Sequence, residues 1–145
     1  MSWGSEVTAK LVPELDVTDL GASLRFYVHV CGFVVRYERP EERFACLDLH
    51  GAAVMFQELG GHGRRFVTAP LERPFGRGVS FQVEVSDVLA MCDRLVGAGC
   101  PIVVPLEDRW YRTSDGAYAG NRQFVVADPD GYLMRFFEDL GVRRD

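Results

Sequence analysis

Length, composition and charge already exclude several classes of protein. The chain has 145 residues, of which 48% are hydrophobic and 26% charged, values typical of one soluble globular domain spanning residues 1–145. A formal net charge of −5 argues against nucleic acid as a partner and is compatible with a cationic ligand. No apolar run approaches the roughly 20 residues of a membrane span. The start, MSWGSEVTAK, lacks a signal-peptide pattern, which favours a cytoplasmic protein with no membrane partner.

The first part of the chain reads as a strand, a helix and three more strands. Residues 10–17, KLVPELDV, alternate between apolar and polar positions, as in a strand with one face on a core. Residues 18–32 carry an apolar stripe at helical spacing, with Thr18 or Asp19 as the cap and Gly32 at the end. The turn-like stretches RPEE and HG separate the further predicted strands, which are residues 33–38, 43–49 and 52–58.

The same order of elements returns in the second part of the chain. Residues 78–85, GVSFQVEV, alternate again, and residues 86–100 form the matching helix, with Ser86 as its cap. Aligning DVTDLGASL with EVSDVLAMC superimposes the strand-to-helix junctions at a period of about 68 residues, which indicates a duplicated module. The last predicted strands are residues 101–105, 121–127 and 132–138.

These elements predict an α+β fold of two βαβββ modules. The first module spans residues 10–58 and the second spans residues 78–138. The segment between them, residues 59–77, is rich in glycine, proline and arginine and reads as a long surface loop or flap. The four cysteines form no C-x-x-C pair, so buried reduced thiols are expected at Cys31, Cys46, Cys92 and Cys100.

Two motifs carry a resemblance to a known family. Together with the duplication, DVTDLGASLRFYVHVCGF after the first strand and DPDGYLMRF near the end resemble the vicinal oxygen chelate superfamily of glyoxalases, extradiol dioxygenases and bleomycin-resistance proteins. The resemblance covers residues 10–138. It implies that the modules form a half-open barrel with the ligand on its concave side. It also implies a homodimer, often with exchanged strands, which would cover exposed sheet edges.

The resemblance also implies where a metal would bind. Enzymes of this group place one ligand on each of the first, fourth, fifth and eighth strands, and these places fall here on Val12, Phe56, Ser80 and Arg135. None is a usual metal ligand, and the guanidinium of Arg135 has no lone pair to give. The histidines are expected outside the strand interiors, at His29, His50 and His62. The sequence therefore predicts no metal, no other cofactor and no evident catalytic residue.

Strand alternation sends a mixed set of side chains to the concave face. Arg135 lies at the centre of an apolar strand, and a buried guanidinium needs an anion, so a pair with Glu14 or Glu84 is expected. Residues 105–124 are predicted as a loop whose aromatic rings either stack on a planar ligand or anchor the loop or a dimer interface. The candidate ligand-binding residues are Glu14, Phe56, Ser80, Gln82, Glu84, Trp110, Tyr111, Tyr118 and Arg135.

These observations favour a metal-free protein of the bleomycin-resistance type, which binds and sequesters a small molecule. The ligand is expected to be planar or cationic and to lie in a cavity at the dimer. Two alternatives stay open at this point. One is a metal-dependent lyase or dioxygenase of the glyoxalase group. The other is a non-enzymatic regulatory module whose cavity is vestigial.

Overall fold

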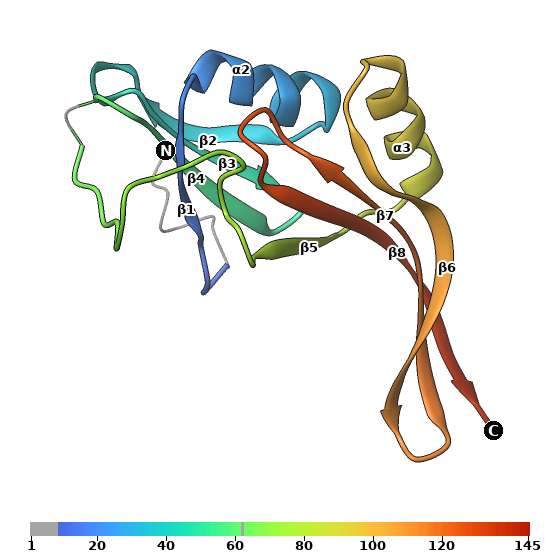
Figure 1. Ribbon diagram of the computed structural model, residues 1–145. Coiled ribbons are helices and arrows are strands. Elements are labelled where there is room, and N and C mark those ends of the chain that lie inside the picture. Colours follow the sequence, from blue (N-terminus) through green and yellow to red (C-terminus); the bar gives the residue numbers. More distant parts are fainter. Residues whose placement is uncertain (1–8, 62) are drawn as a thin grey trace. The chain divides into compact units, whose positions relative to one another are not determined.

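The chain folds as two copies of one module. The computed structural model describes residues 9–61 and 63–145, which divide into two compact units with the boundary between Arg73 and Pro74. Each unit contains one four-stranded mixed sheet with helical segments after its first strand (Figure 1). The predicted α+β class and the duplicated βαβββ order are confirmed. None of the described helices is long and apolar enough to cross a membrane.

The first unit closely follows the predicted order. Its sheet runs β1-β4-β3-β2, with β1 parallel to β4 and the other neighbours antiparallel. The β3–β4 turn has positive φ at both central residues, 50° at His50 and 97° at Gly51, as a tight hairpin turn requires. The elements are β1 (Glu14–Val17), α2 (Leu20–Leu24), η1 (Arg25–Val30), β2 (Val34–Arg39), η2 (Pro40–Glu42), β3 (Phe44–Leu49) and β4 (Ala52–Glu58).

The helix of the first unit changes its geometry half-way. The Asp19 side chain caps α2 by accepting a hydrogen bond from the Ala22 amide at 3.2 Å. The following segment, η1, is a π-helix, which has a wider turn than an α-helix. Phe26 and Tyr27 are both buried there, and the Tyr27 ring packs 4.8 Å from the ring of Phe56 in β4. One face of the sheet is therefore closed by the helix.

The second unit repeats this plan with longer strands. Its sheet runs β5-β8-β7-β6, and β5 is parallel to β8. The cap of the helix is Asp87, which accepts from the Ala90 amide at 3.0 Å, so the prediction of Ser86 as the cap was wrong by one residue. The elements are β5 (Ser80–Glu84), α3 (Val88–Gly97), β6 (Ile102–Ser114), β7 (Ala117–Ala127) and β8 (Leu133–Arg144).

The prediction of a loop at residues 105–124 was wrong. These residues form the outer part of the β6–β7 hairpin, and β8 continues beside β7 as far as Arg144. We call residues 107–122 and 138–144 the arm; in Figure 1 it projects away from α3, toward the C-terminus. Bulges interrupt the alternation of β6, and its many charges resemble those of a loop. A Cβ at Gly120 would meet the Trp110 ring at 2.7 Å, so this aromatic ring fills the place of the missing side chain.

Each unit uses a glutamate of its last strand, β4 or β8, to hold the start of its helix. The Leu20 amide donates to Glu58 Oε1 at 2.9 Å, and the Val88 amide donates to Glu138 Oε1 at 3.1 Å. The Leu20 hydrogen bond, together with the Arg43 guanidinium at 2.8 Å, lowers the pKa of Glu58. Because the same contact recurs in both units, the duplication extends to individual capping groups as well as to the order of the elements.

Candidate functional site

The sheet of the first unit has one face free of its helix. Residues directly opposite each other on neighbouring strands share a face. Glu14 lies opposite Met55, Met55 opposite Cys46, and Cys46 opposite Tyr37, so these four residues share a face. The other face carries Phe56, which packs on the helix. The free face therefore holds a carboxylate, a thioether, a thiol and a phenol in one row.

The predicted position of Phe56 on this free face was wrong. Phe56 has no exposed surface and packs against Tyr27 in the core of the unit. Its neighbours Met55 and Gln57 occupy the free face instead, one opposite Glu14 and the other opposite Asp16. The strand AAVMFQE is mostly apolar on both faces, so alternation alone does not tell which residues point inward.

A pocket of about 360 Å³ lies over this free face. Within it, Arg39 Nε donates to Glu42 at 2.6 Å, which raises the pKa of Arg39, and the guanidinium lies 4.0 Å from the Phe44 ring. Glu14 is exposed and, among the described residues, has no ion-pair partner. We call this the first-unit pocket; its lining residues are Glu14, Tyr37, Arg39, Glu42, Phe44, Met55, Gln57, Gly63, Arg64 and Phe66.

Part of the predicted flap, residues 59–77, forms one wall of the first-unit pocket. Arg65 holds this segment to β1 through a 2.9 Å ion pair with Asp16. The neighbouring residues Arg64 and Phe66 line the pocket, and Phe66 keeps 75% of its surface exposed. A large aromatic side chain that is this exposed beside a pocket is available to cover a bound ligand.

In the second unit, Met134 and Phe136 are buried in the core, so Arg135 between them lies on the opposite face of the sheet, which we call the free face of this unit. The partner of Arg135 differs from the expected one. Arg135 is opposite Gln82 on β5, and its Nη2 donates to Gln82 Oε1. Glu84 shares the face one row further along, and it forms no ion pair with Arg135 in the described part of the chain. The predicted Glu84 pair is therefore wrong. Glu14 belongs to the first unit, and a pair with it stays a prediction.

Sequence reasoning missed Gln123 on the same face. Gln123 is only 4% exposed, and its Nε2 donates to the Tyr111 hydroxyl at 2.7 Å. The Tyr111 ring in turn lies 6.0 Å from the guanidinium carbon of Arg135. The structure thus brings together four polar side chains, of which Gln82, Tyr111 and Arg135 were among the predicted site residues. Alternation along RQFVVA, which puts Gln123 and Val125 on one face, was the available signal.

Within the second unit, Trp110 and Tyr118 are not gathered with this cluster. The Arg143 guanidinium lies 4.5 Å from the Trp110 ring and 5.8 Å from the Tyr118 ring, so both aromatics contribute to the internal packing of the arm. Ser80, at the start of β5, is exposed and lies opposite Leu133.

Comparison with known proteins decides the family. The model of the Glyoxalase/Bleomycin resistance protein/Dioxygenase superfamily matches residues 13–136. The chain belongs to this superfamily. Among curated proteins, no sequence matches it significantly. The predicted resemblance to the vicinal oxygen chelate superfamily is thereby confirmed.

Solved structures of the superfamily fold agree with this assignment. TioX from Micromonospora sp. ML1 is 30% identical, with a TM-score of 0.68 over 90% of this chain and 98% of TioX. Virulence protein STM3117 from Salmonella typhimurium is 18% identical, with a TM-score of 0.66 over 88% and 93% of the two chains. The V. cholerae integron cassette protein VCH_CASS1 is 16% identical, with a TM-score of 0.68 over 92% and 96%. The last two proteins are less than 25% identical to this chain, so their similarity shows a shared fold and nothing about function.

The donor set does not fit the divalent metal that enzymes of the superfamily use. With the fourth-strand position corrected, the four ligand places hold Val12, Met55, Ser80 and Arg135, a set with no imidazole and no carboxylate. No group of three or more His, Cys, Asp or Glu side chains suited to a metal occurs in residues 9–61 and 63–145. His29 and His50 are exposed, and His62 lies outside the described residues.

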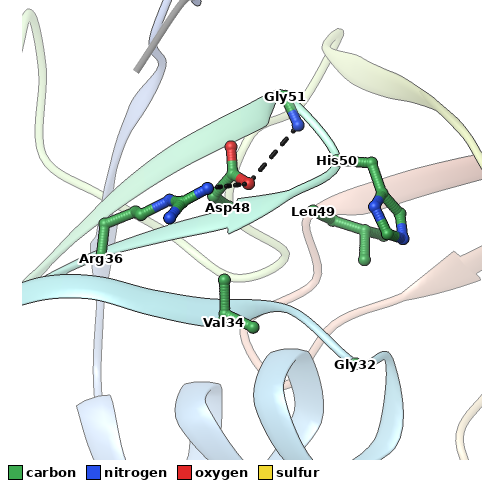
Figure 2. A pocket seen from close by; sticks show the side chains of 7 residues that line it. All are labelled: Gly32, Val34, Arg36, Asp48, Leu49, His50 and Gly51. Atoms are coloured by element: carbon green, nitrogen blue, oxygen red, sulfur yellow. Dashed lines mark hydrogen bonds and ion pairs between the residues drawn. The ribbon is translucent and has the colours of Figure 1, made fainter. Parts of the chain in front are cut away.

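A second pocket of the first unit, of about 420 Å³, lies where β2 and β3 approach the end of the helix (Figure 2). Its polar groups hold the fold together. The carboxylate of Asp48, which is buried, accepts hydrogen bonds from Arg36 Nη2 at 3.1 Å and from the Gly51 amide at 3.4 Å (Figure 2). These contacts tie β2 to the β3–β4 turn. The Asp48 carboxylate therefore has a structural role in this pocket.

Proposed function

We propose that this member of the superfamily is a small-molecule-binding protein, which holds a planar cation in the first-unit pocket without the help of a metal. The observation that carries the proposal is the Glu14 carboxylate, which is exposed at the pocket and unpaired within the described residues. Aromatic rings beside a free carboxylate are suited to a planar cation, since the rings stack on it and the carboxylate attracts its charge. The pocket volume of about 360 Å³ lies in the range of ligand sites.

Two other charges of the first-unit pocket cancel each other, because Arg39 pairs with Glu42 at 2.6 Å. Arg64 also lines the pocket, and its guanidinium carbon lies 5.0 Å from the centroid of the Phe66 ring. Glu14 therefore remains as the acidic group that a ligand can use. A lyase or dioxygenase of the glyoxalase type is less well supported, because the four superfamily ligand places lack metal donors.

Proflavine, a small planar cation, is a direct probe of this proposal. We expect its addition to raise the melting temperature of the protein, because a ligand that binds only the native state stabilises it by mass action. The Glu14→Gln variant should bind proflavine several-fold more weakly, and the effect should shrink as the salt concentration rises. The uncharged planar analogue anthracene-9-methanol should bind the wild type and Glu14→Gln equally.

Glu41→Gln is a matched control, because Glu41 is an exposed glutamate of η2 outside the pocket lining. It removes the same charge from the protein and should leave proflavine binding almost unchanged. If Glu14→Gln and Glu41→Gln weaken proflavine binding equally, only the overall charge matters and the proposed pocket is wrong. Absence of any proflavine binding to the wild type would also count against the proposal.

A further inference from the structure

The first-unit pocket carries two charges of opposite sign that do not neutralise each other. Glu14 lies on β1 and Arg64 lies on the flap, residues 59–77; both side chains line the pocket and are exposed. Neither forms an ion pair within the described part of the chain. Two further charged residues of the lining, Arg39 and Glu42, pair with each other at 2.6 Å. One negative and one positive charge of the described lining are therefore left for a ligand.

Contacts on either side of Arg64 hold the flap over the pocket. Before it, Gly63 lies so close to the side chain of Gln57 that a Cβ on Gly63 would overlap the Gln57 amide. After it, Arg65 forms an ion pair with Asp16 at 2.9 Å. Gln57 and Asp16 are opposite each other on β4 and β1, so both contacts are made to one row of the sheet. Arg64 is thus positioned over the pocket by its two neighbours.

The Arg64 guanidinium remains able to bind an anion. Its carbon lies 5.0 Å from the centroid of the Phe66 ring, so the group makes an aromatic contact in place of an ion pair with Glu14. A guanidinium stacks on a ring through its flat face, and its N–H groups lie in the plane of that face. Stacking on Phe66 therefore leaves these donors directed away from the ring, where a ligand can accept from them.

We propose that the first-unit pocket selects a planar cation that also carries an anionic group, such as a carboxylate, elsewhere on its ring. The cationic end of the ligand lies at Glu14, and the anionic group accepts hydrogen bonds from Arg64 in the forked geometry that carboxylates favour. A ligand with only a positive charge would leave Arg64 without a counter-ion and would be repelled by it. The inference rests on the proposed function and adds the residue that sets the preference among planar cations.

Two probes of nearly equal size test this preference. They are para-amidinobenzoate, a planar cation with a carboxylate, and para-amidinobenzamide, the same cation with a neutral amide. By isothermal titration calorimetry, we expect the unmodified protein to bind the carboxylate probe about threefold more tightly, as for an ion pair partly open to water. The net charge of −5 would by itself favour the purely cationic amide probe, so the expected order requires a local positive partner. Arg64→Gln should bring the two affinities together, and Glu14→Gln should weaken both.

Arg109→Gln is the matched control, because Arg109 is an exposed arginine of β6, in the other unit. It removes the same charge and should keep the preference. The inference is overturned if the unmodified protein binds both probes equally or prefers the amide, or if Arg64→Gln and Arg109→Gln reduce the preference equally. Glu14-dependent binding of proflavine and of the amide probe would then leave the proposed function standing. If neither proflavine nor para-amidinobenzamide binds the unmodified protein, both proposals are wrong.

Discussion

The register of β4 can be tested by truncating two adjacent side chains, Phe56 and Met55. Phe56 is completely buried and its ring packs 4.8 Å from Tyr27, so Phe56→Ala removes a whole ring from the core. Such a truncation typically costs about 3–5 kcal/mol of unfolding free energy. Met55 is half-buried on the free face, where lost methylene contacts are partly replaced by water. We expect Met55→Ala to cost about 1 kcal/mol.

Urea unfolding followed by far-UV circular dichroism measures this difference. Unfolding free energies for domains of this kind total roughly 5–15 kcal/mol, so Phe56→Ala should shift the midpoint strongly and Met55→Ala only slightly. Phe56→Leu, which keeps most of the volume, provides a milder variant if Phe56→Ala does not fold. Proflavine binding should show the opposite order, weakened by Met55→Ala and unchanged in Phe56→Leu. If Met55→Ala is the more destabilising of the two alanine variants, the assigned register is wrong.

Four further properties can be measured. Glu58→Gln should lose about 1–2 kcal/mol of stability at pH 7 through weaker capping of α2. Because the pKa of Glu58 is lowered in the folded state, this contribution is complete above the unfolded pKa of about 4.3 and disappears as the pH falls through the folded pKa. Thermal melts at pH 7 and pH 3 should therefore differ between the wild type and the variant only at pH 7. Burial raises the pKa of Cys46 to about 11, so this thiol should resist Ellman's reagent at pH 8 until the protein is unfolded. Elemental analysis of the purified protein should find no stoichiometric zinc, nickel, iron or manganese; a tightly held equivalent would contradict the assignment of the ligand places. Light scattering at micromolar concentration should give the mass of a homodimer, and a monomer would refute the expectation that pairing covers the sheet edges.

Local sequence patterns were sufficient to predict the order of the elements. Strict alternation in residues 10–17 and 78–85 predicts a strand with one face on a core, and the structure has β1 (Glu14–Val17) and β5 (Ser80–Glu84) within these stretches. The repeat of a strand followed by a helix in both halves of the chain supported this prediction. The hairpin turn at His50 and Gly51 follows from the same kind of local chemistry, since a tight turn needs positive φ at both positions. Contacts within a few residues decide such features.

The predictions from sequence were wrong where contacts between segments far apart in the sequence determine the structure. In β4 both faces are apolar, so the inward position of Phe56 is fixed by the Tyr27 ring, which no local pattern reveals. The arm was missed because bulges break the alternation of β6 and because β8 beyond residue 138 becomes ordered by pairing with β7. The partner of Arg135 depends on the parallel register of β5 and β8, which places Gln82 and not Glu84 opposite it.

The packing of Trp110 gives the arm an optical signal of its own. The chain has two tryptophans, Trp3 and Trp110, and Trp3 lies outside the described residues. In a Trp3→Phe variant, indole fluorescence would come from Trp110 alone, whose ring lies against Gly120 with the Arg143 guanidinium at 4.5 Å. Loosening of the arm would release the ring to water and move its emission to longer wavelength. Comparing that change with the circular dichroism of the whole chain would show whether the arm opens before the rest of the protein unfolds.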